Sequence, residues 1–460
     1  MKKFIIFGVV LALLVPTMAM AATEFSLGGF IKMDMMWDSD NGVGKNMNVL
    51  PSRNNDTNAK HGRLKFTAQG SRFNFTIKGP DLWGAKTSGF IEMDFDAAEV
   101  GTASAGFSAS QSYTPRLRHA MFRFNWPTSE LLFGQYFSMF CEWYAESAED
   151  GPLQMTGTPT ARMAQVRFTQ TFLSDWTVAG LIGNPNQSYL NSGTTAGGYN
   201  SAVNNGQSAE TPQIQGKIKY AHDFWGKAAY YGKPIPFTVQ LVGGWQRSVM
   251  RSGSVTGTGF GEQAGVTGTI TNKNQYVNPW LAMGSVFIPV IPTSSANLAG
   301  TASILTQWWV GQGVEAFGFS GTSGSKYRFD GFFPNTLLYD AELLNNFGGF
   351  VEGQYYFNNQ WFVNALYALR KAFNVSRATW LNTQTIAGRE MAFNNANEPQ
   401  TIQQMSATLW YRPIQAIKFG LQYSYLAASY FQMNTTPTNS ANTSRFGDNH
   451  RVEFVGFFYF

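Results

Sequence analysis

The charged residues that could act on a solute stand at alternate positions of short segments. In 71–78, Arg72 and Lys78 share one phase with other polar residues, whereas apolar residues fill the alternate phase. A following segment places Glu92 and Asp94 in its polar phase. A period of two is typical of strands with one apolar and one hydrated face. Charges on such a face can attract or repel ions that pass along it.

Residues for covalent chemistry are scarce. The chain has four histidines, none in a recognisable nucleophile motif, and Cys141 is its single cysteine. No Ser-His or Asp-His constellation of the kind that hydrolases need can be recognised, and no metal-ligand spacing appears. The sequence therefore predicts a protein that is not an enzyme and that carries no catalytic residue, metal or cofactor.

A further group of acids lies in a long segment between two expected strands. Residues 138–160 contain Glu142, Glu146, Glu149 and Asp150. If this segment folds into a lumen, these acids face basic residues on the wall, and the resulting transverse field orients charged solutes. The alternative is a solvated acidic loop outside the barrel.

The polar phase of the strands is expected to point inward, because a charge that faces lipid at mid-depth costs roughly 2–4 kcal/mol. Bases outnumber acids in this phase, which predicts a weak preference for anions. Arginine suits carboxylates because its guanidinium donates two parallel bonds. For any single residue the alternative is wall solvation or a cross-strand ion pair. Arg72, Arg123 and Arg167 are the first candidates to meet the acidic segment. The candidate pore-lining and constriction residues are Arg72, Lys78, Glu92, Asp94, Arg123, Glu142, Glu146, Arg167, Lys217 and Arg370.

Antiparallel strands must position these side chains. Tight connections alternate with long ones rich in Gly, Ser, Thr and Asn, which include 250–275 and 312–346, as in membrane barrels. The expected strands are 25–37, 71–79, 87–97, 115–126, 129–137, 161–172, 176–184, 211–222, 237–248, 276–291, 301–311, 347–357, 360–371, 400–411, 416–429 and 449–460. Sixteen is even, as bacterial barrels require. The strand number could also be fourteen or eighteen, because residues 60–70 could extend the second strand and prolines make the strand ends in 276–311 uncertain.

Composition favours the same class. Charged residues are 13% of the chain and aromatic residues 15%, and the charged share is about half the globular average. Beyond the N-terminal segment no apolar stretch is long enough for a transmembrane helix. The sequence predicts an all-β transmembrane barrel with long extracellular loops. A net charge of +5 is too small and dispersed to indicate nucleic-acid binding.

The N-terminus has the pattern of an export signal. Lys2 and Lys3 precede the apolar run 4–15, and 19–21 reads Ala-Met-Ala, as a signal peptidase site does. The run is too short to span a bilayer as a helix. We expect residues 1–21 to be a signal peptide, cleaved after about Ala21, and 22–460 to form one barrel in the outer membrane of a Gram-negative bacterium.

Aromatic residues near expected strand ends predict interfacial girdles. They are Trp126, Trp176, Trp361, Trp410, Tyr411 and Tyr423. In the adjacent pair Trp308 and Trp309, at least one ring could face inward. The last strand alternates aromatic residues and ends on Phe460. It resembles the signal that outer-membrane barrels present to the barrel-assembly machinery, which is therefore an expected partner.

Two motifs resemble the Gram-negative porins, most closely the DcaP-like branch. LRHA at 117–120 precedes a turn, and LLFGQYFSMF at 131–140 resembles the strand that enters loop three of that branch. The segments 71–75 and 89–96 are similar to its second and third strands. The resemblance covers about 70 residues. It departs from the branch in one respect, because members often carry a helical periplasmic extension, whereas the first expected strand begins here at Phe25.

The resemblance implies a homotrimeric, sixteen-stranded channel with loop three folded inward and a preference for small organic anions such as carboxylates. Expected partners are outer-membrane lipid, lipopolysaccharide and small anionic or polar solutes. The expected function is that of a porin whose water-filled channel passes small hydrophilic solutes. The alternative is a non-conducting structural or adhesive outer-membrane barrel.

Overall fold

The computed structural model describes most of the chain from Glu24 onward. The described ranges are 24–40, 51–56, 60–96, 113–148, 157–158, 161–185, 206–258, 267–318, 325–333, 336–373, 399–430 and 444–460. Residues 1–23, with the expected signal peptide, lie outside them. No helix in these ranges is long and apolar enough to cross a membrane.

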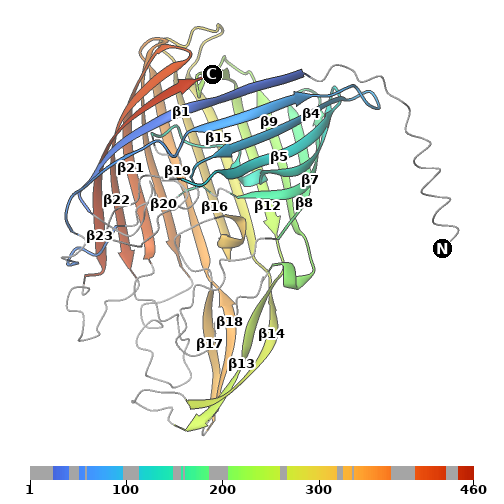
Figure 1. The fold of residues 1–460 in the computed structure, drawn as a ribbon, viewed down its shortest axis with the longest axis vertical. Helices are drawn as coiled ribbons and strands as arrows, with labels where there is room; N and C mark the ends of the chain where they lie inside the picture. Colours follow the sequence, from blue (N-terminus) through green and yellow to red (C-terminus); the bar gives the residue numbers. More distant parts are fainter. Residues whose placement is uncertain are drawn as a thin grey trace, which may run out of the picture.

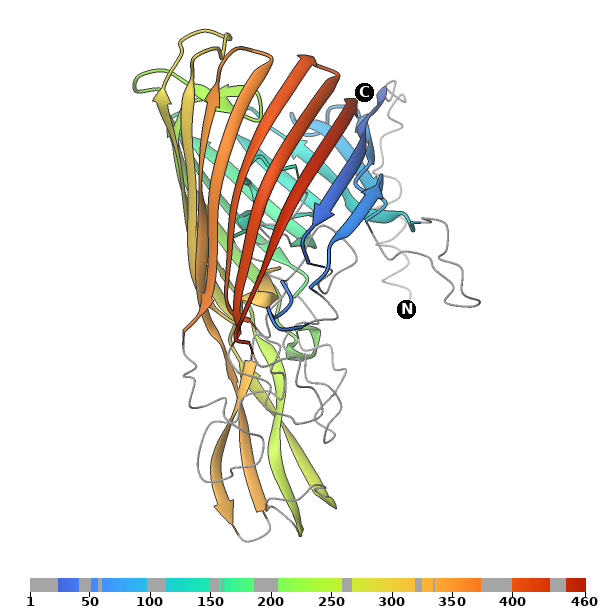
Figure 2. The same cartoon turned by 90° about the vertical axis from the view of Figure 1, so that its left-hand side faces the viewer.

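The main sheet closes into a barrel, since β1 pairs with the last strand, β23, on one side and with β2 and β3 on the other. Within the described residues, seventeen strands form this sheet, and β2 and β3 together occupy one position, which leaves sixteen positions around the wall. The strands are β1 (Glu24–Asp38), β2 (Arg63–Thr67), β3 (Arg72–Lys78), β4 (Lys86–Asp94), β5 (Arg116–Asn125), β6 (Ser129–Phe137), β7 (Arg162–Phe172), β8 (Trp176–Gly183), β9 (Gln213–His222), β12 (Phe237–Trp245), β15 (Trp280–Ile291), β16 (Ala302–Gln312), β19 (Asn345–Tyr356), β20 (Trp361–Ala372), β21 (Pro399–Ile414), β22 (Ile417–Tyr430) and β23 (Phe446–Tyr459). Figures 1 and 2 show the tilted strands of this wall.

The wall has the reverse of the usual soluble pattern, with polar residues inside and apolar residues outside. In β22, Lys418 and Gln422 are buried, whereas their neighbours Phe419, Leu421 and Tyr423 are exposed on the outer face. Most of the other strands have the same alternation, and neighbouring strands pair antiparallel. Such a surface suits a barrel with an apolar surround. The polar face therefore points into the lumen, as the sequence predicts.

All sixteen expected strands are present with ends shifted by a few residues, so the predicted strand number is confirmed. The open question about 60–70 has a local answer. The second strand is interrupted between Thr67 and Arg72, and both pieces pair with β1. The strand ends that meet through short connections, such as that between β7 and β8, define the short-turn rim. The other end is the long-loop rim.

Two expected loops contain strands that the sequence did not predict. β13 (Ser248–Thr258) and β14 (Thr267–Val277) lie within or beside 250–275, and β17 (Ser325–Phe333) and β18 (Thr336–Leu343) lie in 312–346. The two hairpins pair through β13 and β18 and form a four-stranded sheet. This sheet projects from the long-loop rim (Figures 1 and 2). Pairing between two distant loops supplies hydrogen bonds that neither hairpin has alone.

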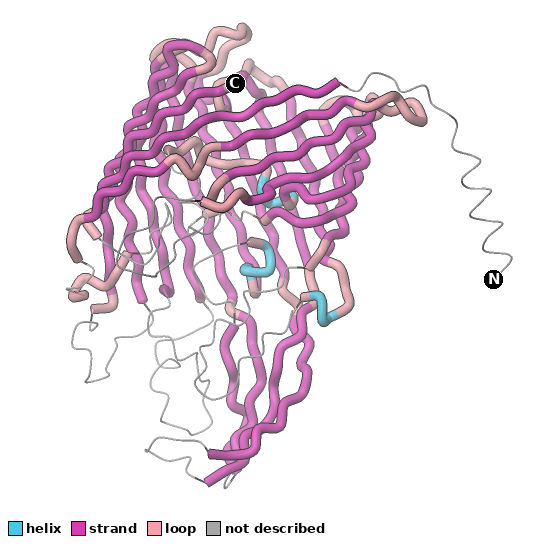
Figure 3. Tube along the Cα trace, in the orientation of Figure 1, coloured by secondary structure: helices cyan, strands magenta, loops and turns pink. Residues whose placement is uncertain are grey.

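Smaller elements lie in the interior and at the rims. η1 (Met139–Cys141) begins the segment after β6, η2 (Gln207–Ala209) precedes β9, and η3 (Val314–Phe317) follows β16; Figure 3 shows these short 3-10 helices in cyan. At the short-turn rim, β10 (Ala228–Tyr230) and β11 (Lys233–Ile235) form a hairpin between β9 and β12. The apolar clusters of the interior join η1, η3 and this hairpin to the inner wall.

Candidate functional site in the barrel lumen

The segment that follows β6, here called loop three, crosses the lumen. Its described residues are 138–148 together with 157 and 158. Near its start, Met139 N donates to Gln215 Oε1 on β9 at 2.8 Å. Nine residues later, Ala148 N donates to Gln422 Oε1 on β22 at 2.8 Å. Loop three therefore folds inward and connects two separate parts of the wall.

Two acids of loop three face bases on the wall. Glu142 forms an ion pair with Lys217 of β9. Glu146 Oε1 lies 2.9 Å from Lys418 Nζ of β22, and its second oxygen accepts from Gln354 Nε2 at 3.0 Å. The other expected acids, Glu149 and Asp150, lie outside the described residues.

Wall side chains also hold the backbone around Glu146. Glu352 Oε1 accepts from Glu146 N at 3.0 Å and from Asn364 Nδ2 at 2.7 Å. Lys32 Nζ donates to Ala148 O at 2.8 Å and pairs with Asp34 of its own strand. These wall groups are buried. Because a buried peptide group without a partner is costly, such bonds keep loop three in one position.

Inside the barrel, the wall formed by the main-sheet strands from β12 to β23 is covered by tightly packed side chains. We call its inward-facing residues the packed wall. Trp143 of loop three packs with Phe287, Leu305, Phe350 and Leu366 in one buried cluster. The polar members of the packed wall are buried as well, among them Gln307, Gln404 and Ser424. This part of the interior resembles a protein core rather than a hydrated surface.

One tryptophan of the expected girdle belongs to the packed wall. Trp410 is 0% exposed, and its Nε1 donates to Asn364 Oδ1 at 2.8 Å. Lys418 Nζ lies 4.0 Å above its ring. The girdle prediction for Trp410 is therefore wrong, because this residue stands in the inward phase of β21 and its neighbour Tyr411 does not. In the adjacent pair on β16, Trp309 faces inward and Trp308 outward.

On the inner wall opposite, several charged side chains are partly exposed. We call this region the open wall. It consists of the inward-facing residues of β3 to β6 and of those near the short-turn ends of β7 to β9. The Arg123 side chain is 30% exposed and pairs with Glu130 at 3.1 Å, whereas the Lys418 side chain of the packed wall is 5% exposed. Arg167 lies at the edge of the open wall, 3.9 Å from the same Glu130. Lys219 and Arg72 are half-buried members of the open wall.

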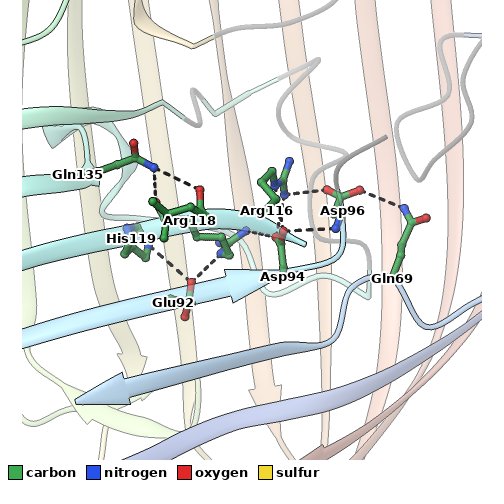
Figure 4. Close-up of polar contacts among 9 residues, drawn as sticks. Gln69, Glu92, Asp94, Asp96, Arg116, Arg118, His119 and Gln135 are labelled. Atoms are coloured by element: carbon green, nitrogen blue, oxygen red, sulfur yellow. Dashed lines mark hydrogen bonds and ion pairs between the residues drawn. The ribbon is translucent and has the colours of Figure 1, made fainter. Parts of the chain in front are cut away.

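A charged cluster lies on the open wall toward the long-loop rim (Figure 4). Arg116 donates two bonds to the Asp94 carboxylate, at 2.9 and 2.7 Å. Arg118 pairs with Glu92 at 2.6 Å and with Asp94 at 2.7 Å, and His119 Nε2 lies 3.7 Å from Glu92. The charges of Glu92 and Asp94 are thus neutralised by Arg116 and Arg118, which were not among the predicted pore-lining residues.

An irregularity in β5 explains why those bases were missed. The register between β4 and β5 shifts at Glu92 and Met93, so Glu92 faces His119 and Met93 faces Leu117. Arg118 is the extra residue of this β-bulge, and both Arg118 and His119 turn inward. A bulge breaks the alternation on which inward residues are assigned. The adjacent polar residues Arg118 and His119 inside an apolar strand were the available signal.

Of three further predicted residues, two lie away from the open wall and one belongs to it. Lys78 pairs with Glu24 at the short-turn rim, where both side chains are about two-thirds exposed. Arg370 pairs with Glu315 of η3 at 3.0 Å, and both are 1% exposed, so Arg370 belongs to the packed wall. Arg72 lies on the open wall above the Phe30 ring, at 5.3 Å.

The expectation that Arg72, Arg123 and Arg167 would meet loop three is wrong for the described residues. Arg123 and Arg167 share Glu130 of β6, and Arg72 stacks on Phe30. The described part of loop three turns away from these strands and docks on β9, β12 and β19 to β23. Apolar side chains such as Trp143 find a core there, which explains the choice of wall.

Burial changes the acid–base properties of loop three. Burial raises the pKa of the Cys141 thiol and holds the pKa of the Tyr144 hydroxyl well above its usual range. Both groups therefore stay neutral at ordinary pH. In the described part of the chain, no group of three His, Cys, Asp or Glu side chains is placed to hold a metal ion.

A hollow of about 800 Å³ lies on the outer surface and is separate from the lumen. Its lining includes the outward-facing Val178, Ile218 and Leu241, and Gly216 and Gly243 leave its floor without side chains. The hollow therefore belongs to the apolar outer face of the barrel and not to the candidate site.

Comparison with solved structures identifies the architecture. The outer membrane channel DcaP of Acinetobacter baumannii aligns with a TM-score of 0.61 and 16% identity, over 95% of this chain and 98% of that chain. OmpT, an outer membrane protein of Vibrio cholerae in its trimer form, aligns with a TM-score of 0.50 and 10% identity, over 96% of this chain and 100% of that chain. The fold is that of an outer-membrane porin.

At these identities the likeness is one of fold, and it confirms the resemblance to DcaP-like porins at that level. No protein-family model and no curated protein matched the sequence. Within the porin fold, the lumen of this chain is divided by loop three into an open and a packed wall, and the open wall is the candidate functional site.

Proposed function

We propose that this protein is an outer-membrane porin, in which small hydrophilic solutes pass along the open wall and small organic anions, carboxylates included, are favoured. The observation that carries the proposal is the division of the lumen. Loop three and the packed wall occupy one side, so a solute path is left beside β3 to β6. Several charged side chains beside this path are partly exposed, whereas the charged side chains of the packed wall are buried.

The charges of the open wall support the anion preference. Arg72, Arg123 and Lys219 face the path with Arg116, which is 33% exposed. The acids on the same wall are fewer, and Glu130 is shared by Arg123 and Arg167. An excess of base along a narrow path raises the local concentration of anions. Guanidinium groups can also hold a carboxylate by two parallel hydrogen bonds.

The cellular setting forms part of the proposal. We place the protein in the outer membrane after removal of residues 1–21, as a homotrimer surrounded by lipid and lipopolysaccharide. The exposed apolar band of the barrel supports a lipid environment, since Phe122, Leu241, Leu421 and Phe454 all face outward. Phe460 directly follows β23, the strand that we expect the barrel-assembly machinery to recognise. We assign no enzymatic activity.

Planar-bilayer recording of the purified trimer tests the function. Steady conductance is expected, with a reversal potential in a salt gradient that indicates anion preference. Absence of conductance in a trimer that shows heat-modifiable migration on a gel would overturn the proposal. That result would favour a non-conducting structural or adhesive barrel. The large extent of the packed wall is the observation that supports this alternative. Conductance with cation preference would overturn the assignment of the open wall as the selective element.

A further inference from the structure

The β10–β11 hairpin enters the lumen from the short-turn rim. Ser303 Oγ, on the inner face of β16, donates to Ala229 O at 3.1 Å. Ala228 and Ala229 are buried, and the Tyr230 ring lies 6.2 Å from the ring of Phe287 on the packed wall. The connection between β9 and β12 therefore does not remain at the rim, as a simple barrel turn does.

The tip of this hairpin contacts loop three. Tyr144 N donates to the Tyr230 hydroxyl at 3.2 Å, and the Tyr231 hydroxyl donates to Ala145 O at 2.9 Å. The ring of Tyr230 also packs on Trp143, with centroids 4.8 Å apart. Loop three, which starts at the long-loop rim, is thus held by a segment that starts at the opposite rim.

The turn of the hairpin has an unusual residue for its conformation. Tyr231 and Gly232 are its two central residues, with φ of 49° and 75°. Two-residue turns with positive φ at both positions favour Asn, Asp or Gly. A tyrosine there is strained. The hydroxyl bond from Tyr231 to loop three gives a physical reason for tyrosine at this position.

We propose that the β10–β11 hairpin is a buttress that fixes the position of loop three and thereby sets the width of the solute path. The proposal rests on the proposed porin function. The hairpin contacts loop three at Tyr144 and Ala145, so a displaced hairpin leaves this part of loop three without that support. The hydroxyls of Tyr230 and Tyr231 bond to two consecutive residues of loop three, which orients its backbone as well as holding it.

Three variants test the buttress. Tyr230→Phe with Tyr231→Phe removes both hydroxyls and retains both rings. Tyr231→Asn removes the contact with Ala145 and at the same time suits the turn better, so misfolding of the hairpin cannot explain its effect. Tyr220→Phe is the matched control, because Tyr220 lies near the same rim on β9 and packs on Trp176 of the wall instead of loop three.

Single-channel conductance and the largest polyethylene glycol that enters the pore are the first readouts. We expect the double variant and Tyr231→Asn to raise conductance on the order of twofold, with more current noise and entry of larger polymers. The control is expected to match the wild type. Conductance, noise and polymer exclusion that are unchanged in both tyrosine variants would overturn the buttress.

The alkylation rate of Cys141, the native thiol of loop three, is a second readout that needs no conductance. Release of loop three is expected to raise this rate severalfold over the wild type in folded trimers. A wild-type trimer that does not conduct would overturn the proposed function, whereas the Cys141 rates would still decide whether the hairpin holds loop three. Equal rates in the wild type and in both tyrosine variants would overturn the further inference.

Discussion

The packed wall and the open wall are built from the same alternating strands, yet their charged residues are in different environments. Lys418 on the packed wall is 5% exposed and pairs with a Glu146 carboxylate that is 1% exposed. Arg123 on the open wall is 30% exposed and pairs with Glu130 at 21%. The difference arises because loop three and the β10–β11 hairpin cover one wall and leave the other. An inward base is therefore structural or solute-facing according to what lies over it.

This difference predicts unequal costs for the same chemical change. Lys418→Met leaves Glu146 buried without its base, and loss of one partner of a buried pair costs about 3–5 kcal/mol. Arg123→Met is the matched control on the open wall, where a partly exposed pair contributes about 0–1 kcal/mol. The free energy of unfolding, measured by urea titration of the reconstituted barrel, gives both values. Equal costs would contradict the division of the lumen.

Apolar residues sharpen the same comparison within one strand. Leu305 of β16 is 2% exposed in the packed interior, whereas its neighbour Ile304 is 36% exposed on the outer face. Leu305→Ala is expected to lower the free energy of unfolding by about 2–4 kcal/mol through the cavity it leaves. Ile304→Ala is expected to cost about 1 kcal/mol or less. If Ile304→Ala destabilises the barrel as much as Leu305→Ala does, the assignment of the packed core to the inner face is contradicted.

Selectivity should respond to the open wall. Arg123→Gln combined with Lys219→Gln removes two partly exposed bases beside the path, and the anion-to-cation permeability ratio is expected to fall about twofold. Lys371→Gln makes the same type of change on the exposed face of β20 and is expected to leave the ratio unchanged. Reversal potentials in a salt gradient measure the ratios. A shift caused by Lys371→Gln alone would show that the charges of the open wall do not set selectivity.

The smallest expected signal concerns Cys141. Burial raises the pKa of its thiol, so little reactive thiolate forms at neutral pH. Iodoacetamide is therefore expected to leave Cys141 almost unmodified in the folded trimer and to label it fully after unfolding. Labelling increases as pH rises, because deprotonation is then favoured. Rapid labelling of the folded wild type at pH 7 would show that loop three leaves the packed wall.

Much of the barrel could be predicted from local pattern. Alternation located the strands of the main sheet except β2, and it placed Asp94, Lys217 and Arg370 inward, where the structure has them. It also predicted that acids of loop three would face basic wall residues if the loop folds inward, and Glu142 and Glu146 do so. These predictions succeed because strand period and the cost of exposing charge to lipid are properties of short segments.

The remaining features depend on contacts between distant segments. The β-bulge that turns both Arg118 and His119 inward breaks the two-residue alternation of β5. Trp410 lies near a strand end, which indicated a girdle residue, but it stands among the inward-facing residues of β21 and is buried. The pairing of β13 with β18 joins two loops about 80 residues apart in the chain. No local pattern carries this information.

The sequence by itself determined a barrel with a polar interior and the strands that form its wall, because each strand's alternation follows from its own residues. Only the tertiary structure decided which inward charges face a solute. That choice depends on where loop three docks and on the hairpin that meets it, through bonds such as that between Tyr231 and Ala145, 86 residues apart. The physical reason is that burial of a wall residue is set by the segment that covers it.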